Sequence, residues 1–121
     1  MSISVVVADD SRVMRQIVIR TLRQAGYDWD VREASDGAEA FAAVKAEEPD
    51  VVLSDWNMPN MTGIELLRTL RNAGYQTPFG FVTSEGSPEM RATAEAAGAL
   101  FLIAKPFTPE SFREVIDPVL A

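Results

Sequence analysis

Apolar and polar positions follow two patterns that alternate along the whole chain. Five short segments, most of them runs of consecutive apolar residues, predict strands over residues 3–8, 29–34, 50–55, 77–83 and 99–104. After each segment, apolar residues recur at helical spacing, which predicts helices over residues 11–26, 35–48, 63–74, 88–98 and from 108 onward. The pattern therefore predicts five strand–helix units in strict alternation.

Residues that favour helix ends lie at the limits of these segments. Ser11 can cap the first helix, and Gly26 stands where a glycine commonly follows a helix. Ser87 followed by Pro88 marks the start of the fourth helix. Pro118 is expected to end or fray the last helix near its final turn, because proline lacks the amide hydrogen that a helix interior needs.

Strict alternation of strands and helices predicts an α/β fold, a doubly wound parallel sheet with helices on both faces. The strand segments agree, since strands buried on both faces are continuously apolar. A length of 121 residues suits a single domain over residues 1–121 and is too short for two. The predicted core consists of Val5, Val6, Val7, Val51, Val52, Leu53, Phe79, Phe81, Val82, Phe101 and Ile103.

Composition narrows the chemistry open to the chain. No apolar run approaches the length of a membrane span, and the first residues lack the basic region of a signal peptide, so we expect a cytoplasmic protein with no membrane association. The sequence contains no cysteine and no histidine, which excludes disulfides, thiol nucleophiles and serine–histidine catalytic pairs. A net charge of −7 argues against nucleic-acid binding, because phosphate backbones are repelled by an acidic surface.

Polar residues lie at the ends of four predicted strands. Asp9 and Asp10 follow the first strand, Asp55 ends the third, Thr83 ends the fourth and Lys105 follows the fifth. The carboxyl ends of parallel strands share one edge, where doubly wound sheets bind ligands, so these side chains should converge. Three close carboxylates repel one another unless a cation is present, and this donor set favours Mg²⁺. A metal, an ammonium and a hydroxyl beside a carboxylate favour phosphoryl transfer through an acyl phosphate.

Six short segments carry a resemblance to a known family. They are "VADDS", "DGAEA", "DWNMPNMTGIELL", "FVTSE", "EAAGA" and "AKPF". In this order, each near the end or start of the expected element, they are similar to the receiver domains of two-component response regulators. The resemblance spans essentially the whole chain, and it implies a flavodoxin-like (βα)5 sandwich with the strand order 2-1-3-4-5.

The resemblance also implies roles for individual acids. Asp55 matches the phosphoacceptor. Asp10 and Asp55, together with the main-chain carbonyl of Asn57, match the groups that bind Mg²⁺ directly, and Asp9 matches an acid that acts on the metal through water.

Two further groups are matched at the ends of the last two strands. Thr83 matches the hydroxyl that holds a phosphoryl oxygen, and Lys105 matches the ammonium that pairs with the phosphoryl group. The Lys105–Pro106 peptide bond is expected to be cis by this resemblance. Asn57 and Glu85 match variable positions that tune how fast the family loses its phosphoryl group.

The sequence departs from the family pattern at three positions. Leu102 stands where the family usually carries the tyrosine or phenylalanine that turns inward on activation, and the neighbouring Phe101 should face the opposite side of its strand. Thr62 stands where the family often has aspartate. Ser84 stands where it often has alanine, and its hydroxyl is expected near the phosphoryl site. These departures bear on how phosphorylation reaches the surface.

The family resemblance implies a signalling function rather than an enzyme acting on a separate substrate. A histidine kinase, a phosphotransfer protein or a small acyl phosphate would phosphorylate Asp55 with Mg²⁺, in chemotaxis or another pathway. The domain would catalyse its own phosphorylation and dephosphorylation. A downstream protein, which the sequence does not identify, would bind the surface formed by the helix over 88–98, the strand over 99–104 and the last helix.

Four arginines without an acid mark the first predicted helix. Arg12, Arg15, Arg20 and Arg23 lie within residues 11–23. Such a cluster is most often a solvated helix face. The family resemblance adds the hypothesis that it docks an acidic or phosphorylated partner such as a histidine kinase.

Two other functions stay open on the sequence alone. A small aspartyl-phosphate hydrolase of the haloacid-dehalogenase type would carry a second acid two residues after its nucleophile, where this chain has Asn57. A receiver-fold adaptor that is never phosphorylated would suit Leu102 but not the intact set of acids. The chain is either a complete single-domain regulator or the receiver of a larger protein.

Overall fold

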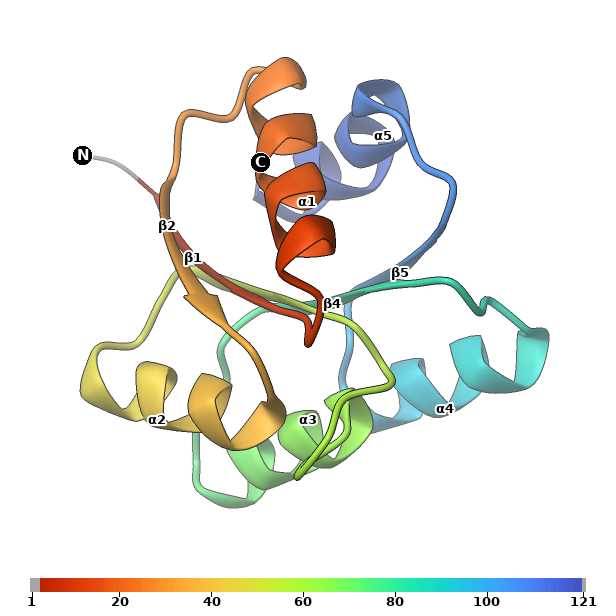
Figure 1. The fold of residues 1–121 in the computed structure, drawn as a ribbon. Helices are drawn as coiled ribbons and strands as arrows, with labels where there is room; N and C mark the ends of the chain where they lie inside the picture. Colours follow the sequence, from red (N-terminus) through yellow and green to blue (C-terminus); the bar gives the residue numbers. More distant parts are fainter. Residues whose placement is uncertain (1–2, 121) are drawn as a thin grey trace.

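The computed structural model describes residues 3–120 and contains five strands and five helices in alternation (Figure 1). The strands are β1 Ser4–Ala8, β2 Asp30–Ala34, β3 Val51–Ser54, β4 Phe79–Thr83 and β5 Phe101–Ala104. The helices are α1 Arg12–Gln24, α2 Gly37–Ala46, α3 Gly63–Asn72, α4 Pro88–Ala97 and α5 Pro109–Leu120. Every predicted element is present, and each observed boundary lies within two residues of the expected one. No helix in this described part of the chain has both the length and the apolar character needed to cross a bilayer.

The five strands form one parallel sheet with the order β2-β1-β3-β4-β5, which confirms the predicted doubly wound, flavodoxin-like fold. The register sets which strand ends lie side by side. Ala8 at the end of β1 pairs with Ala34 of β2 and with Ser54 of β3. Thr83 at the end of β4 pairs with Ala104 of β5. The residues that follow these strands therefore leave the sheet along the same edge.

Helices cover both faces of the sheet, α1 and α5 on one face and α2, α3 and α4 on the other (Figure 1). Alternate strand residues enter the two cores, as β-strand geometry requires. Val5 and Val7 contribute to the core beneath α1 and α5, whereas Val6 contributes to the core beneath α2, α3 and α4. The two cores share no side chain, so the sheet separates two distinct packing layers.

Ten of the eleven predicted core residues are buried, and Phe101 is only partly buried. Phe101 lies on β5, an edge strand with a neighbour on one side only. Its ring lies across Gly80 of β4, where an added Cβ would come within 2.1 Å of the ring. Leu102 was not in the predicted core, yet it is 7% exposed and packs in the opposite layer from Phe101. The expected opposite orientation of these two residues is therefore confirmed.

The helix ends follow the sequence signals with one exception. Ser11 caps α1 by accepting a hydrogen bond from the amide of Met14 at 3.2 Å, and Ser87 caps α4 in the same way with Pro88 in the first turn. Pro118 lies in the last turn of α5, as expected, but it does not end the helix, which continues to Leu120. Proline so close to the end removes a single intrahelical hydrogen bond, which water at the exposed last turn can replace.

Candidate functional site

Three carboxylates converge at the edge where β1 and β3 end. Asp9 and Asp10 follow β1, and Asp55 follows β3 in the paired register described above. One carboxylate oxygen from each of them lies within 4.8 Å of the other two. Asp9 is buried at 3% exposure, Asp55 is half-buried and Asp10 is exposed. The cluster is thus fixed at its base and open to solvent at its rim.

The ammonium of Lys105 completes this cluster from β5. Lys105 Nζ lies 3.7 Å from Asp9 Oδ2 and 3.8 Å from Asp55 Oδ2, and its side chain is 19% exposed. The Lys105 amide donates a hydrogen bond to the Thr83 carbonyl at 2.8 Å, which continues the pairing of β4 and β5. The Lys105–Pro106 bond is cis, as expected. Four side chains from three strand ends therefore face one point.

Electrostatics at this edge disfavour three free anions. Burial raises the pKa of Asp9 above its ordinary value, and the negative charges of Asp55 and Asp10 raise it further. The amide of Ser11, which donates to Asp9 Oδ1 at 2.9 Å, and the ammonium of Lys105 act in the opposite direction. A bound cation would relieve the remaining repulsion.

The donor set fits Mg²⁺ better than a softer metal. The side chains that meet here offer carboxylate oxygens and no sulfur or imidazole nitrogen, which is the preference of a hard cation. Mg²⁺ keeps several waters when it is bound by protein, and the exposed side of Asp10 leaves room for them. The three acids therefore have the chemistry of a site for a hard divalent cation.

Asp55 is held through both its main chain and its carboxylate. Its amide donates to the Ala8 carbonyl at 2.8 Å, and its carbonyl accepts the Ser54 hydroxyl at 2.8 Å. Its Oδ1 accepts the Trp56 amide at 2.7 Å. Gly63, the first residue of α3, approaches so closely that an added Cβ would lie 2.1 Å from the Asp55 carbonyl oxygen. Ser54 and Gly63 were not among the predicted site residues, although Ser54 precedes the segment "DWNMPNMTG" and Gly63 ends it.

The remaining predicted site residues surround the cluster without joining it through side-chain bonds. Thr83 is completely buried at the end of β4, and its hydroxyl accepts a 3.4 Å hydrogen bond from the Glu85 amide. Ser84 and Glu85 are exposed on the following loop. Asn57 is exposed two residues beyond Asp55, on the β3–α3 loop.

Trp56 packs beside the site, as a structural residue would. Its ring lies 4.8 Å from that of Phe81, and it contacts the core beneath α2, α3 and α4. Because Trp56 adjoins Asp55 directly, its fluorescence should respond to a ligand at the cluster.

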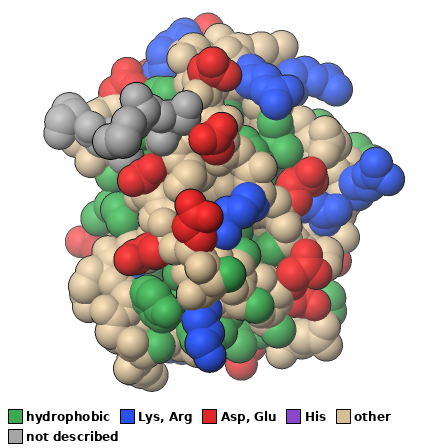
Figure 2. All heavy atoms as spheres, turned by 90° about the vertical axis from the view of Figure 1, so that its left-hand side faces the viewer, with side chains coloured by type: hydrophobic (Ala, Val, Ile, Leu, Met, Phe, Trp, Pro, Cys, Tyr) green, Lys and Arg blue, Asp and Glu red, His purple; other side chains and the backbone are tan. Residues whose placement is uncertain are grey.

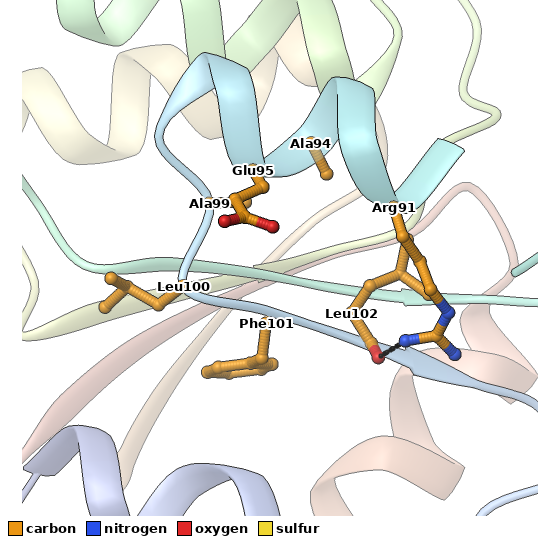
Figure 3. A pocket seen from close by; sticks show the side chains of 7 residues that line it. All are labelled: Arg91, Ala94, Glu95, Ala99, Leu100, Phe101 and Leu102. Carbon is orange, nitrogen blue, oxygen red and sulfur yellow. Dashed lines mark hydrogen bonds between the residues drawn. The ribbon is translucent and has the colours of Figure 1, made fainter. Parts of the chain in front are cut away.

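A groove of about 570 Å³ lies between α4 and β5 (Figure 3). Its walls are Arg91, Ala94 and Glu95 of α4, the connection Ala99–Leu100, and the start of β5. Arg91 donates to the carbonyl of Leu102 at 3.1 Å and to that of Gly86 at 3.3 Å. The guanidinium therefore joins β5 to the loop that follows Thr83.

The four arginines of α1 do not form one uniform surface. Arg12, Arg20 and Arg23 are exposed, whereas the Arg15 side chain is 13% exposed and bonded within the protein.

Figure 2 shows the β2 and α2 side of the molecule, where acidic and basic side chains are interspersed. The described side chains of that face therefore form no continuous basic surface that could follow a phosphate backbone.

The sequence and the fold of this chain are similar to those of several known proteins. Residues 5–117 match the sequence model of the family "Response regulator receiver domain". Chemotaxis protein CheY1 of Helicobacter pylori (strain J99) is 40% identical over 117 residues, covering 94% of each chain. A CheY homolog of Campylobacter jejuni (strain 81-176) is 43% identical over 117 residues, covering 94% of this chain and 89% of the relative. The crystal structure of Vibrio cholerae CheY4 at low pH superposes with a TM-score of 0.86 at 37% identity, covering 98% and 99% of the two chains.

Proposed function

Because this chain belongs to the response regulator receiver domain family, we propose that it is a phosphorylation-activated switch whose phosphoacceptor is Asp55. One observation carries the proposal. Asp9, Asp10 and Asp55 meet within 4.8 Å, with the Lys105 ammonium 3.8 Å from Asp55. This arrangement places a nucleophilic carboxylate beside acids for a cation and beside a fixed positive charge. Those are the groups that phosphoryl transfer needs.

The proposed reaction is an in-line displacement at phosphorus. An Asp55 carboxylate oxygen forms the new bond to phosphorus while the bond from phosphorus to a histidine nitrogen of the donor breaks. The imidazole leaves with the electron pair, and the product is an acyl phosphate on Asp55. Mg²⁺, when bound, neutralises charge on the phosphoryl oxygens. Asp10, Asp55 and the main-chain carbonyl of Asn57 would hold the metal, with Asp9 acting through water.

Two further residues are assigned to the phosphorylated state. Lys105 already lies between Asp9 and Asp55, so its ammonium can pair with a phosphoryl oxygen by a small movement. Thr83 is buried at the adjacent strand end, where its hydroxyl accepts the Glu85 amide and keeps its own hydrogen to donate to a phosphoryl oxygen. A movement of Thr83 toward that oxygen would carry the Glu85 amide with it, would move the loop held by Arg91, and would change the groove between α4 and β5.

A receiver domain implies a histidine kinase as partner, and the exposed part of the α1 arginines is its proposed docking surface. Arg12, Arg20 and Arg23 form this surface, since Arg15 is engaged inside the protein. Reversal of Arg20 and Arg23 to glutamate should slow phosphotransfer from the kinase or from a phosphotransfer protein. Phosphorylation by acetyl phosphate should be spared, because that donor needs no docking surface. Equal rates with the protein donor would refute the docking surface.

The remaining proposals concern cellular context. Both curated relatives described above are named as chemotaxis proteins, so we propose a chemotaxis pathway, with a downstream protein bound at α4, β5 and α5. We propose a cytoplasmic location, because the kinase that supplies the phosphoryl group consumes ATP. Residues 1–121 are proposed to act as one receiver domain.

The phosphoacceptor assignment can be tested by intact-mass measurement. The protein is incubated with Mg²⁺ and acetyl phosphate beside an Asp55→Asn variant and a sample containing chelator. One added phosphoryl group that requires both Mg²⁺ and Asp55 is the expected result. Beryllofluoride, a stable phosphoryl mimic, should shift Trp56 fluorescence even if the acyl phosphate hydrolyses quickly. Absence of both signals would favour a receiver-fold adaptor that is never phosphorylated.

A further inference from the structure

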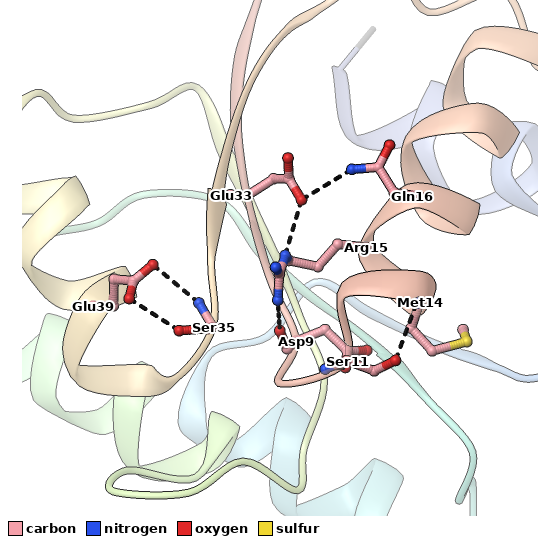
Figure 4. Close-up of polar contacts among 8 residues, drawn as sticks. All are labelled: Asp9, Ser11, Met14, Arg15, Gln16, Glu33, Ser35 and Glu39. Carbon is pink, nitrogen blue, oxygen red and sulfur yellow. Dashed lines mark hydrogen bonds and ion pairs between the residues drawn. The ribbon is translucent and has the colours of Figure 1, made fainter.

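Arg15 makes an internal contact that neither docking nor phosphoryl transfer explains (Figure 4). Its Nη1 donates to the main-chain carbonyl of Asp9 at 2.7 Å, and its Nε pairs with Glu33 Oε1 at 2.9 Å. Gln16 donates to the same Glu33 oxygen at 3.2 Å. The guanidinium is therefore held in place by β2 while it holds the peptide that carries the site acids.

The two peptide groups that adjoin Asp9 are each held by one contact. Its amide donates to the carbonyl of Ala34 in β2 at 3.0 Å, and its carbonyl accepts Arg15. A peptide group is planar, so the Asp9 carbonyl lies in one plane with the amide and Cα of Asp10. Fixing that carbonyl therefore orients the backbone from which the Asp10 side chain projects.

Asp10 depends on its backbone more than the other two acids do. The Asp9 carboxylate accepts the Ser11 amide, and the Asp55 carboxylate accepts the Trp56 amide. Within residues 3–120 the Asp10 carboxylate accepts no hydrogen bond from the protein, and the side chain is exposed. Its position relative to Asp9 and Asp55 is therefore set by its two flanking peptides, of which Arg15 holds the first and the Asp9 carboxylate holds the second.

We propose that Arg15 is a positioning residue that sets the metal affinity of the site by orienting the Asp9–Asp10 peptide. The Arg15 contacts run to a main-chain oxygen and to Glu33, and within residues 3–120 none of them reaches a carboxylate of the site. The expected effect is therefore on the backbone geometry of the site. The inference rests on the proposed function, since it assumes that the acids bind Mg²⁺.

The test compares Mg²⁺ dissociation constants by calorimetric titration with magnesium chloride. Arg15→Gln should weaken Mg²⁺ binding by about tenfold, the lower end of the range for loss of outer-shell support in metal sites. Arg32→Gln is the matched control, because Arg32, a residue of β2, is another arginine whose guanidinium donates to main-chain oxygens, the carbonyls of Ala43 and Glu47. Those contacts involve the end of α2 and none of the site acids. Arg15→Lys, which keeps a cationic donor but loses the planar guanidinium that spans both acceptors, should give an intermediate affinity.

The outcomes separate this inference from the proposed function. If the unmodified protein gives no Mg²⁺ signal, the proposed function fails and the inference fails with it. If the unmodified protein binds Mg²⁺ and Arg15→Gln binds it equally well, only the inference is overturned. Equal weakening by Arg15→Gln and Arg32→Gln would also overturn it, since general loosening would then explain both.

A second variant covers the case in which Arg15→Gln does not fold. Glu33→Ala keeps the guanidinium but removes the acceptor that holds it, and should weaken Mg²⁺ binding by about threefold, the equivalent of one hydrogen bond. The Asp9 carboxylate and its contact with Ser11 remain in this variant. An unchanged dissociation constant in Glu33→Ala would overturn the inference.

Discussion

At the residue scale, the position of Asp55 depends on the absence of a side chain at Gly63. Gly63 opens α3 and donates its amide to the Trp56 carbonyl at 2.8 Å, which brings the helix start against the end of β3. The space beside the Asp55 carbonyl is then too small for any Cβ. The geometry of the site therefore depends on the missing side chain at Gly63 as well as on the acids.

Gly63→Ala should therefore damage both stability and phosphorylation. Its Cβ would lie 2.1 Å from the Asp55 carbonyl oxygen, so β3 or α3 must shift. We expect the free energy of unfolding to fall by about 3 kcal/mol, the upper part of the range for overpacking. A shift of Asp55 should also slow phosphorylation by acetyl phosphate by at least about tenfold. Urea denaturation and a mass time course measure the two effects.

Gly74→Ala provides the control for this substitution. Gly74 follows α3 at a φ of 93° with no atom within 4 Å of an added Cβ. Alanine there should cost about 1 kcal/mol through backbone conformation alone and leave phosphorylation unchanged. Phosphorylation of Gly63→Ala at the normal rate would show that the close approach does not position Asp55.

At the element scale, the connections between strands and helices are defined by caps and by side-chain bonds between neighbouring helices. Thr62 replaces the aspartate that the family often has, and it forms a complete capping box with Glu65 at the start of α3. Threonine at this position therefore still caps the start of α3. On the opposite face, the Tyr27 hydroxyl after α1 donates to Asp117 of α5.

Thr62→Ala should lower the free energy of unfolding by about 1 kcal/mol, because the amide of Glu65 loses its acceptor. Thr62→Asp should stay within about 0.5 kcal/mol of the unmodified protein, since aspartate is an equally good cap. Chemical denaturation of the three proteins measures the difference. A loss in Thr62→Asp as large as that in Thr62→Ala would mean that the hydroxyl contributes more than a cap.

Tyr27 should make stability decrease at alkaline pH. Burial, and then its hydrogen bond to the Asp117 carboxylate, raise the pKa of Tyr27 far above its ordinary value. Above about pH 10 the unfolded chain loses this proton while the folded chain keeps it, so stability falls as the pH rises. Tyr27→Phe should lose about 1 kcal/mol at neutral pH. It should also show a smaller decrease between about pH 8 and about pH 10.5. An identical pH dependence in both proteins would contradict this.

At the scale of the whole molecule, the three acids link metal binding to folding. Burial, and then the negative charges of Asp55 and Asp10, raise the pKa of Asp9, so the ionised acids oppose folding when no cation is present. A ligand that binds only the folded chain stabilises it by mass action. Only the folded chain brings the three acids together into one site. Mg²⁺ is therefore expected to increase the stability of the folded state.

Mg²⁺ at about one hundred times its dissociation constant should raise the free energy of unfolding by about 2.7 kcal/mol. Asp10→Asn should abolish most of this gain because it removes a metal ligand. In chelator the same variant should be more stable than the unmodified protein, because it relieves repulsion on Asp9. Denaturation midpoints with Mg²⁺ and with chelator test this reversal. A variant less stable under both conditions would show that Asp10 contributes to folding in another way.

The sequence by itself determined the type and order of the elements. Apolar runs, periodic apolar positions and capping residues act locally, so they can be read from neighbouring positions, as at Ser11 and Ser87. The alternation of strands and helices leads to a parallel sheet with one ligand-binding edge. From this alone Asp9, Asp10, Asp55 and Lys105 could be expected to meet. Local signals did not decide whether Pro118 ends α5 or lies within its last turn, because the cost of a proline depends on how much helix follows it.

Only the tertiary structure decided the contacts between residues that lie far apart in the chain. Arg15 belongs by sequence to a row of arginines on α1, but packing turns it toward Glu33 of β2 and the Asp9 carbonyl. By sequence, Gly63 is only the first residue of a helix. The need for glycine there arises because α3 packs against the Asp55 carbonyl. Leu102 is buried opposite Phe101, and the carbonyl of Leu102 is bound by Arg91. These arrangements depend on distances between elements, which local patterns do not encode.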